Sequence, residues 1–238
     1  MMKKSYLKIL LLFSLIIISC SDNDDQNLNN NLLQETPEAH VQFNSSNFGI
    51  YKGVFVGSSG IVIVNVNNDN SISVSLTIDG VNYPFTSNEI IQENQQTEIN
   101  FINGNNSFTF SVLSNGIDPQ ISDLSIEGHP NATIILVKET SNSLVELFEG
   151  TYAGIDGSDD GGTFNAIVIG TDMYVLANST AYDVFYTATG AINGNSISGA
   201  TTTGTNFTGI IDGNDDMSGT WTNTQSSDNG TWSLIRTY

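Results

Sequence analysis

Apolar and polar residues alternate with a period of two along much of the chain, and this pattern constrains the fold more than any other feature. Residues 72–78 alternate branched apolar side chains with serine and threonine, and residues 107–112 repeat the pattern with phenylalanine and valine. Such alternation is typical of a strand with one face in a core and the other in water. No segment beyond residue 44 has a sustained helical period.

Pairs of residues that favour tight turns separate these runs. They are Asp79-Gly80, Asn103-Gly104, Asn115-Gly116, Asn193-Gly194, Asp212-Gly213 and Asn229-Gly230. These pairs tolerate positive φ, and their turns have the twist that joins antiparallel strands. The sequence therefore predicts an all-β fold, an antiparallel meander arranged as a barrel or a sandwich.

An internal repeat divides this β region. Residues 48–53 match 148–154, aligning Tyr51 with Tyr152, while Phe108-Thr109 matches Phe207-Thr208 and residues 131–138 match 229–236. Three matches in order at nearly constant spacing indicate a duplication. We expect two tandem copies of about 90 residues, at 45–140 and 147–238, with room for several short strands each. They form either two small barrels or sandwiches, or two halves of one larger sheet.

Charge and cysteine content exclude several classes of protein. The 238 residues include 6 Lys and Arg against 25 Asp and Glu, a net charge of −19. Such a surface repels phosphate, so we expect no nucleic-acid partner. A single cysteine rules out a disulfide scaffold and a multi-cysteine zinc site.

The first nineteen residues have the pattern of a secretory signal peptide. Lys3, Lys4 and Lys8 precede an apolar run at 9–18, which is about half the length needed to cross a bilayer. We expect residues 1–19 to be removed. The mature chain would then keep three cations against 25 acids, a formal charge of −22 (3 minus 25).

The end of the apolar run, Ile17-Ile18-Ser19-Cys20, resembles the lipobox of bacterial lipoproteins. The resemblance implies that Cys20 is diacylated, becomes the amino terminus and is acylated again, which anchors the protein to a membrane without a spanning helix. The next residues resemble the acidic export signal of surface lipoproteins of the Bacteroidetes. They are Ser21, Asp22, Asn23, Asp24 and Asp25. The resemblance implies a lipid anchor in the outer membrane facing the exterior, with a periplasm-facing anchor as the alternative.

Residues 20–44 are rich in Asn, Asp and Gln, and Pro37 interrupts any helix. We interpret this segment as the lipidated cysteine followed by an acidic flexible tether.

Catalytic signatures are sparse. His40 lies in the tether and His129 precedes Pro130 in an expected turn, and the chain has no Gly-x-Ser-x-Gly. A glycosidase-type carboxylate pair would have to come from glutamates in polar stretches. These are Glu89, Glu93, Glu98, Glu127, Glu139, Glu146 and Glu149. We expect no enzymatic activity.

One acidic turn resembles the opening of a calcium-binding loop. Asp156, Ser158 and Asp160 supply oxygens at positions one, three and five, and Gly161 occupies position six. The bidentate glutamate at position twelve is absent, because residue 167 is Ile167. We predict either a Ca²⁺ site at these three residues or a plain acidic loop.

Aromatic residues are candidates for a ligand site or for the core. Tyr51, Tyr152, Trp221 and Trp232 could stack on a sugar, but burial of large aromatic rings favours the core. Residues 218–221 and 229–232, both Gly-x-Trp, resemble strands of calycin-like lipoprotein β-barrels. We expect a non-catalytic binding or structural module for a glycan, protein or ion, with a lipocalin-like carrier or a β-barrel hydrolase as the alternatives.

Overall fold

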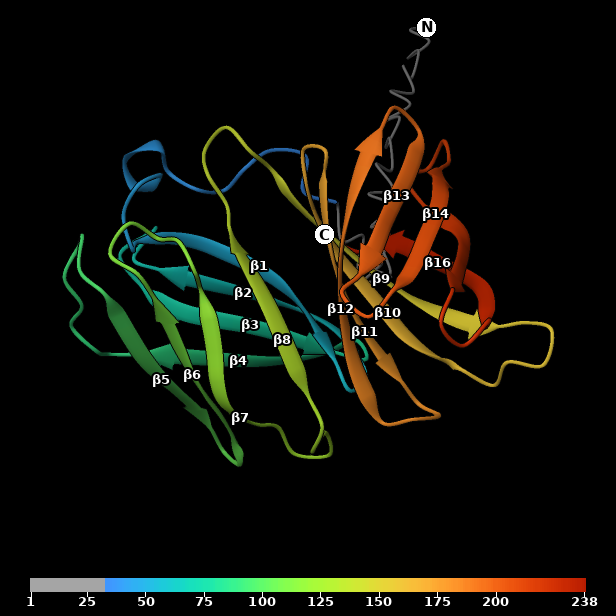
Figure 1. Cartoon of the computed structure of the whole chain (residues 1–238). Helices are drawn as coiled ribbons and strands as arrows, with labels where there is room; N and C mark the ends of the chain where they lie inside the picture. Colours follow the sequence, from blue (N-terminus) through green and yellow to red (C-terminus); the bar gives the residue numbers. More distant parts are fainter. Residues whose placement is uncertain (1–32) are drawn as a thin grey trace, which may run out of the picture. The chain divides into compact units, whose positions relative to one another are not determined.

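The first eight strands of the computed structural model form two antiparallel sheets (Figure 1). The structure describes residues 33–238. One sheet has the order β4-β3-β2-β1-β8 and the other β5-β6-β7. The strands are β1 (Gly49–Val56), β2 (Ser59–Val66), β3 (Ile72–Ile78), β4 (Val81–Ser87), β5 (Thr97–Asn103), β6 (Asn106–Val112), β7 (Gln120–Ser125) and β8 (Thr133–Lys138).

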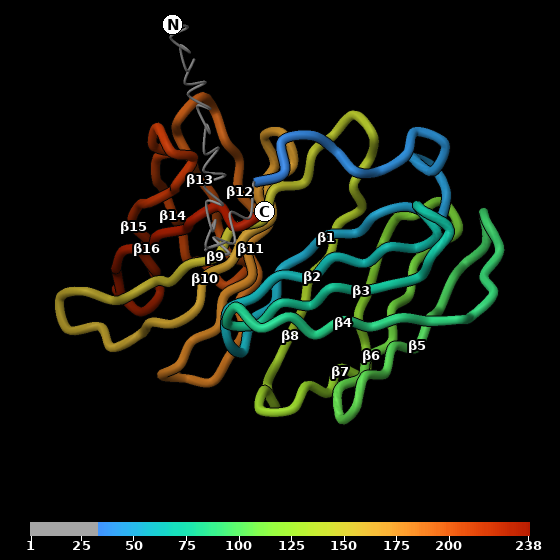
Figure 2. Tube along the Cα trace, turned by 180° about the vertical axis from the view of Figure 1, so that it is seen from behind, coloured from blue at the N-terminus to red at the C-terminus, as the bar shows by residue number. Residues whose placement is uncertain are grey.

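The second eight strands form a closed antiparallel barrel, in which β9 pairs with both β10 and β16 (Figure 2). They are β9 (Val145–Gly154), β10 (Gly161–Ile169), β11 (Asp172–Ser179), β12 (Val184–Asn193), β13 (Ser196–Thr201), β14 (Thr205–Ile211), β15 (Met217–Asn223) and β16 (Asn229–Arg236). The predicted all-β antiparallel fold is confirmed. Closure leaves the barrel with no free strand edge.

The two sets of eight strands have the same order of neighbours. Strand β1 lies between β2 and β8, as β9 lies between β10 and β16. The first set differs at two seams, β4 with β5 and β7 with β8, where neighbouring strands are not paired. It is therefore an eight-stranded meander divided into two facing sheets, whereas the second set is closed.

The strand register corrects one of the three sequence matches. Lys138 pairs with Tyr51, and the matching Arg236 pairs with Phe148, so Tyr51 corresponds to Phe148. Alignment of Tyr51 with Tyr152 was wrong by four residues. In this register Gly53 and Gly150 occupy equivalent positions, and both positions require glycine. A Cβ at Gly53 would collide with the carbonyl oxygen of Ile135, and one at Gly150 with that of Ser233.

Five of the six predicted turn pairs lie at connections between consecutive strands. At Asp79-Gly80 both residues have positive φ, 48° and 78°, as a two-residue hairpin turn requires. The exception is Asn229-Gly230, which begins β16. Here glycine provides space, because a Cβ at Gly230 would overlap the indole of Trp221.

Pairs of glycine and a large aromatic residue fill the barrel. Gly219 pairs with Trp232 and Gly230 pairs with Trp221 across β15 and β16, and Gly199 pairs with Phe207 across β13 and β14. The Trp221 ring occupies the space that a side chain at Gly230 would need, as Phe207 does at Gly199, and the Trp232 ring does so at Gly209 of β14. The repeated Gly-x-Trp pattern thus places two indoles inside the barrel, and both are buried, as the prediction of core aromatics required.

A separate apolar layer joins the two β assemblies. Val54 and Val56 of β1 pack with Val145 and Leu147 of β9 and with neighbouring residues of β10 and β11. Every residue of β1 is buried, because one face covers the core between the two sheets and the other meets the barrel.

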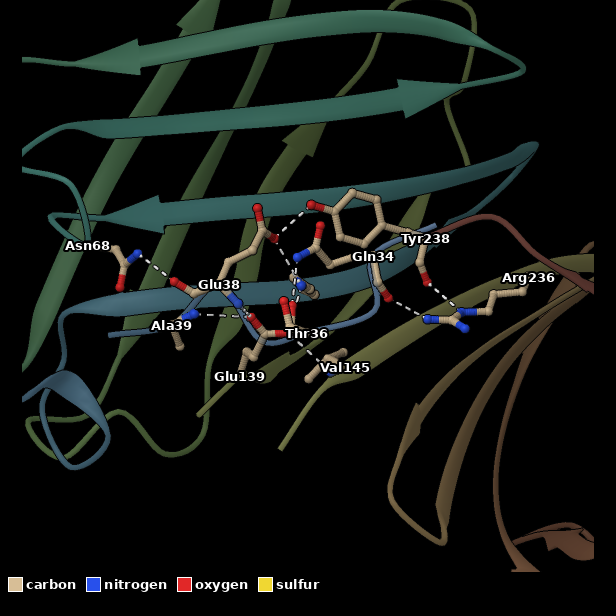
Figure 3. Close-up of polar contacts among 10 residues, drawn as sticks. Gln34, Thr36, Glu38, Ala39, Asn68, Glu139, Val145, Arg236 and Tyr238 are labelled. Carbon is tan, nitrogen blue, oxygen red and sulfur yellow. Dashed lines mark hydrogen bonds and ion pairs between the residues drawn. The ribbon is translucent and has the colours of Figure 1, made fainter. Parts of the chain in front are cut away.

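Residues 33–44, which we call the strap, cross this junction (Figure 3). Asn44 bonds to Ser141, and the strap backbone contacts side chains of both assemblies. The predicted flexible tether therefore differs from the structure over these residues, because their backbone groups have fixed partners. A short 3₁₀ turn, η1 (Val41–Phe43), ends the strap.

The predictions for the signal peptide at 1–19, for Cys20 and for Ser21, Asp22, Asp24 and Asp25 concern residues outside the described part of the chain. Within residues 33–238, no helix has the length and apolarity needed to span a bilayer.

Candidate functional site

A buried charge cluster holds the junction together. The Nζ of Lys52 lies 2.6 Å from Glu139 and 3.0 Å from Glu38, and the side chains of Lys52 and Glu139 are both fully buried. The carboxylate of Glu139 also accepts hydrogen bonds from the backbone N–H groups of Glu38, Ala39 and Val145 (Figure 3). Both oxygens of Glu139 are engaged, so this carboxylate stabilises the junction and is not free for chemistry.

The other two cations of the described chain are also engaged. Arg236 forms an ion pair with Glu146 at 3.1 Å and donates to the carbonyl of Gln34. Lys138 donates to the carbonyls of Phe43, Ser46 and Phe48, and burial lowers its pKa to about 8. The positive charges in residues 33–238 thus hold the strap and the residues that follow it against the β assemblies.

A pocket opens at one end of the barrel, and we call it the mouth pocket. Its volume is about 70 Å³. The residues that line it come from most barrel strands and the loops at this end: Tyr152, Asp160, Phe164, Val175, Ala177, Tyr186, Ala188, Thr201, Thr205, Phe207, Trp221, Asn223 and Asp228. A cluster of buried apolar side chains occupies the barrel interior, and a pocket of this volume accepts a small molecule or one group of a larger one.

Aromatic rings form the inner wall of the mouth pocket. The Tyr152 ring meets Phe164 at 6.4 Å and Trp221 at 5.9 Å, both edge to face. Trp221 Nε1 is buried and has no hydrogen-bond partner within residues 33–238. By contrast, Nε1 of Trp232, deeper in the barrel, donates to the carbonyl of Thr220 at 3.3 Å. A buried unpaired donor is costly, and at Trp221 it lies in a ring that lines a cavity.

Carboxylates form the rim. Asp160 lies at the end of the β9–β10 loop and accepts hydrogen bonds from Tyr152 Oη at 2.9 Å and Ser179 Oγ at 2.7 Å. Asp228 lies in the β15–β16 connection, half-buried. Burial, with Asp160 nearby, raises the pKa of Tyr152 and Tyr186 above the ordinary value. The rim is therefore a region of negative potential beside aromatic faces.

The three predicted calcium ligands make different contacts in the structure. Asp160 turns to Tyr152 and Ser179, Ser158 Oγ accepts from the backbone N–H of Asp160 at 3.4 Å, and Asp156 is exposed. In the described part of the chain, no three His, Cys, Asp or Glu side chains are grouped to hold a metal ion. Calcium binding stays a prediction.

The candidate histidines and glutamates lie outside the lining of the mouth pocket. His40 stacks on Phe43 and His129 meets the ring of Phe55 edge to face. The seven candidate glutamates are absent from the pocket lining; for example, Glu149 accepts a hydrogen bond from Ser59 across the junction. Of the four candidate aromatics, Tyr152 and Trp221 line the pocket, while Tyr51 and Trp232 do not. Sequence reasoning missed Asp228, because a lone aspartate in a polar turn gives no signal.

A second concavity, about 610 Å³, is an open groove between β8, the β6–β7 loop and the outer wall of the barrel at β11–β13. Its charged lining residues are Lys138 and Asp118, and Lys138 is engaged with backbone carbonyls. The groove therefore offers mainly apolar and threonine side chains.

The chain matches no protein-family model and no curated protein sequence.

Proposed function

We propose that this chain is a lipoprotein of the outer membrane, anchored through Cys20 and displayed outward, and that it acts as a non-catalytic binding module with the mouth pocket as its ligand site. The unpaired Nε1 of Trp221 in the pocket wall carries the binding part of the proposal. Native proteins rarely bury a donor without an acceptor, and a bound ligand or ordered water would supply one.

The filled barrel interior favours this proposal over a carrier of a large apolar molecule. Carrier barrels enclose a cavity of several hundred Å³, whereas the mouth pocket has about 70 Å³. The sequence of residues 17–25 supports the anchor and the surface location by resemblance to lipoprotein signals. A glycan or protein partner that inserts one group into the pocket remains consistent with its size.

Binding is tested by following the two indole N–H signals in a heteronuclear NMR spectrum of the full chain carrying Cys20→Ser. A panel of small neutral, cationic and anionic compounds is added one at a time. We expect at least one compound to shift the Trp221 signal, assigned by Trp221→Phe, because its Nε1 gains an acceptor.

Ala188→Leu, which fills the pocket, should abolish the shift, while Ala191→Leu on the exposed face of the same strand should leave it unchanged. If no compound in the panel moves the Trp221 signal in a way that Ala188→Leu removes, the mouth pocket is not the ligand site.

The anchor is tested separately in a bacterium that processes lipoproteins. The wild-type chain should incorporate labelled palmitate and pellet with membranes, and Cys20→Ser should do neither, because the thiol is the acceptor of the diacylglyceryl group. Protease added to intact cells should digest the wild-type protein. Acyl labelling that survives Cys20→Ser would contradict the anchor, and protection from protease would contradict outward display.

A further inference from the structure

In residues 33–238, no ion pair neutralises the carboxylates at the mouth pocket. Asp159, Asp160 and Asp228 all act on Tyr182, whose hydroxyl donates to Asp159 at 3.2 Å, and together they raise the pKa of Tyr182. The three cations of residues 33–238 are engaged at the junction or with the residues beside it. No ion pair of Lys52 or Arg236 reaches the rim in this part of the chain.

The aromatic wall of the mouth pocket also favours a positively charged ligand. The faces of tyrosine, tryptophan and phenylalanine rings carry negative electrostatic potential, and they attract cations at close range. Tyr152, Trp221 and Phe164 contribute such rings, and Tyr186 of β12 and Phe207 of β14, the strand partner of Trp221, add two more. An anionic ligand would meet both repulsive carboxylates and repulsive ring faces.

We propose that the mouth pocket binds a small organic cation, an ammonium or methylated ammonium group placed between the carboxylates of Asp160 and Asp228 and the aromatic wall. This inference rests on the proposed function, since it names the ligand of the same pocket. An oxygen on the ligand, a few bonds from the nitrogen, would accept the free hydrogen of Trp221 Nε1. A volume of about 70 Å³ suits one such group.

Matched pairs of probes test the charge directly. Choline is compared with 3,3-dimethylbutan-1-ol, which has the same shape without the charge, and benzylammonium with benzyl alcohol. Affinities are measured by the Trp221 indole shift in the full chain carrying Cys20→Ser. We expect each cation to bind at least tenfold more tightly than its neutral partner, since the neutral compound loses both the Coulomb and the cation–π attraction.

Asp228→Asn should weaken choline binding roughly fivefold to tenfold and leave the neutral partner within about twofold, because only the charge of the rim changes. Asp172→Asn is the matched control. It makes the same change of net charge on an exposed residue of β11, outside the pocket lining, and should leave both affinities unchanged.

The outcomes separate the ligand class from the binding role. Preference for the cations that Asp228→Asn reduces and Asp172→Asn does not would support the inference. Equal binding of charged and neutral partners would overturn the cation and leave the binding function intact. No binding of any of the four probes would also overturn the cation, and the binding function would then depend on the wider panel.

Discussion

Glu139 shows how one residue can hold three segments together. It follows β8 in the connection between the two β assemblies, and its carboxylate contacts Lys52 of β1, two N–H groups of the strap and the first N–H of β9. The side chain of Glu139 is fully buried, so its carboxylate is stable as an anion only while all these partners are present. The same contacts fix Lys52, whose other ion-pair partner is the partly exposed Glu38.

Glu139→Ala should lower the free energy of unfolding by about 3 kcal/mol, because it leaves the buried Lys52 with only the half-exposed Glu38 as a partner. Urea denaturation followed by tryptophan fluorescence measures the change. Glu38→Ala is the comparison and should cost no more than about 1 kcal/mol.

The double variant Lys52→Met, Glu139→Leu should recover most of the loss, since it removes both charges from the buried site. A loss for the double variant as large as for Glu139→Ala would show that the backbone hydrogen bonds, and not the charge balance, hold the junction.

Among the elements, the strap is the segment whose docked position the sequence pattern did not predict. Its Asn-rich and Gln-rich composition is typical of a linker, and neither periodicity nor turn signals indicate a docked conformation. Several of its contacts are made by backbone N–H and C=O groups to side chains distant in the sequence, such as Glu139 and Arg236. A pattern of side chains cannot reveal the contacts that the backbone makes.

Replacement of residues 33–44 by a Gly/Ser segment of equal length should destabilise the protein by roughly 2–4 kcal/mol, because it removes the buried side chain of Phe43 and the carboxylate of Glu38 that pairs with Lys52, and because a glycine-rich backbone loses more conformational entropy on docking. Hydrogen exchange should increase most at β1 and β9. The same replacement of residues 21–32 is the control and should leave exchange in β1 and β9 unchanged. Unchanged exchange in both variants would mean that the strap is not a structural element.

At the scale of the whole molecule, sequence patterns predicted the class of fold, because alternation and turn pairs act locally. They could not predict that one meander closes and the other divides into two sheets. That difference depends on whether β4 pairs with β5 and β7 with β8, which is decided by distant packing. The mouth pocket could not be predicted either, because strands β10 to β15 separate Asp160 from Asp228 in the sequence.

Stability should vary with pH in two stages above neutrality. Burial lowers the pKa of Lys138 to about 8 from an ordinary value of 10.5, so the unfolded chain binds more protons above pH 8 and stability rises with pH there. Burial raises the pKa of Tyr51, Tyr152 and Tyr238 above 10, so the folded chain keeps protons that the unfolded chain loses, and stability falls above pH 10.

Melting temperatures recorded from pH 7 to 11 should therefore pass through a maximum between about pH 8 and 10. Lys138→Met should remove the rising part and leave the fall. A rise that persists in Lys138→Met would assign it to another group.

The attachment of the strap has a geometric consequence for ligand capture. Strand β16 runs from Asn229, beside the rim, to Arg236, where Gln34 and Glu35 of the strap are held. In the proposed lipoprotein, the chain that leads to Cys20 would leave the described residues at this base of the barrel, and its thirteen peptide units reach at most about 45 Å. A lipid on Cys20 would then tether the barrel by the end away from the mouth pocket and leave the opening accessible to solutes of the medium.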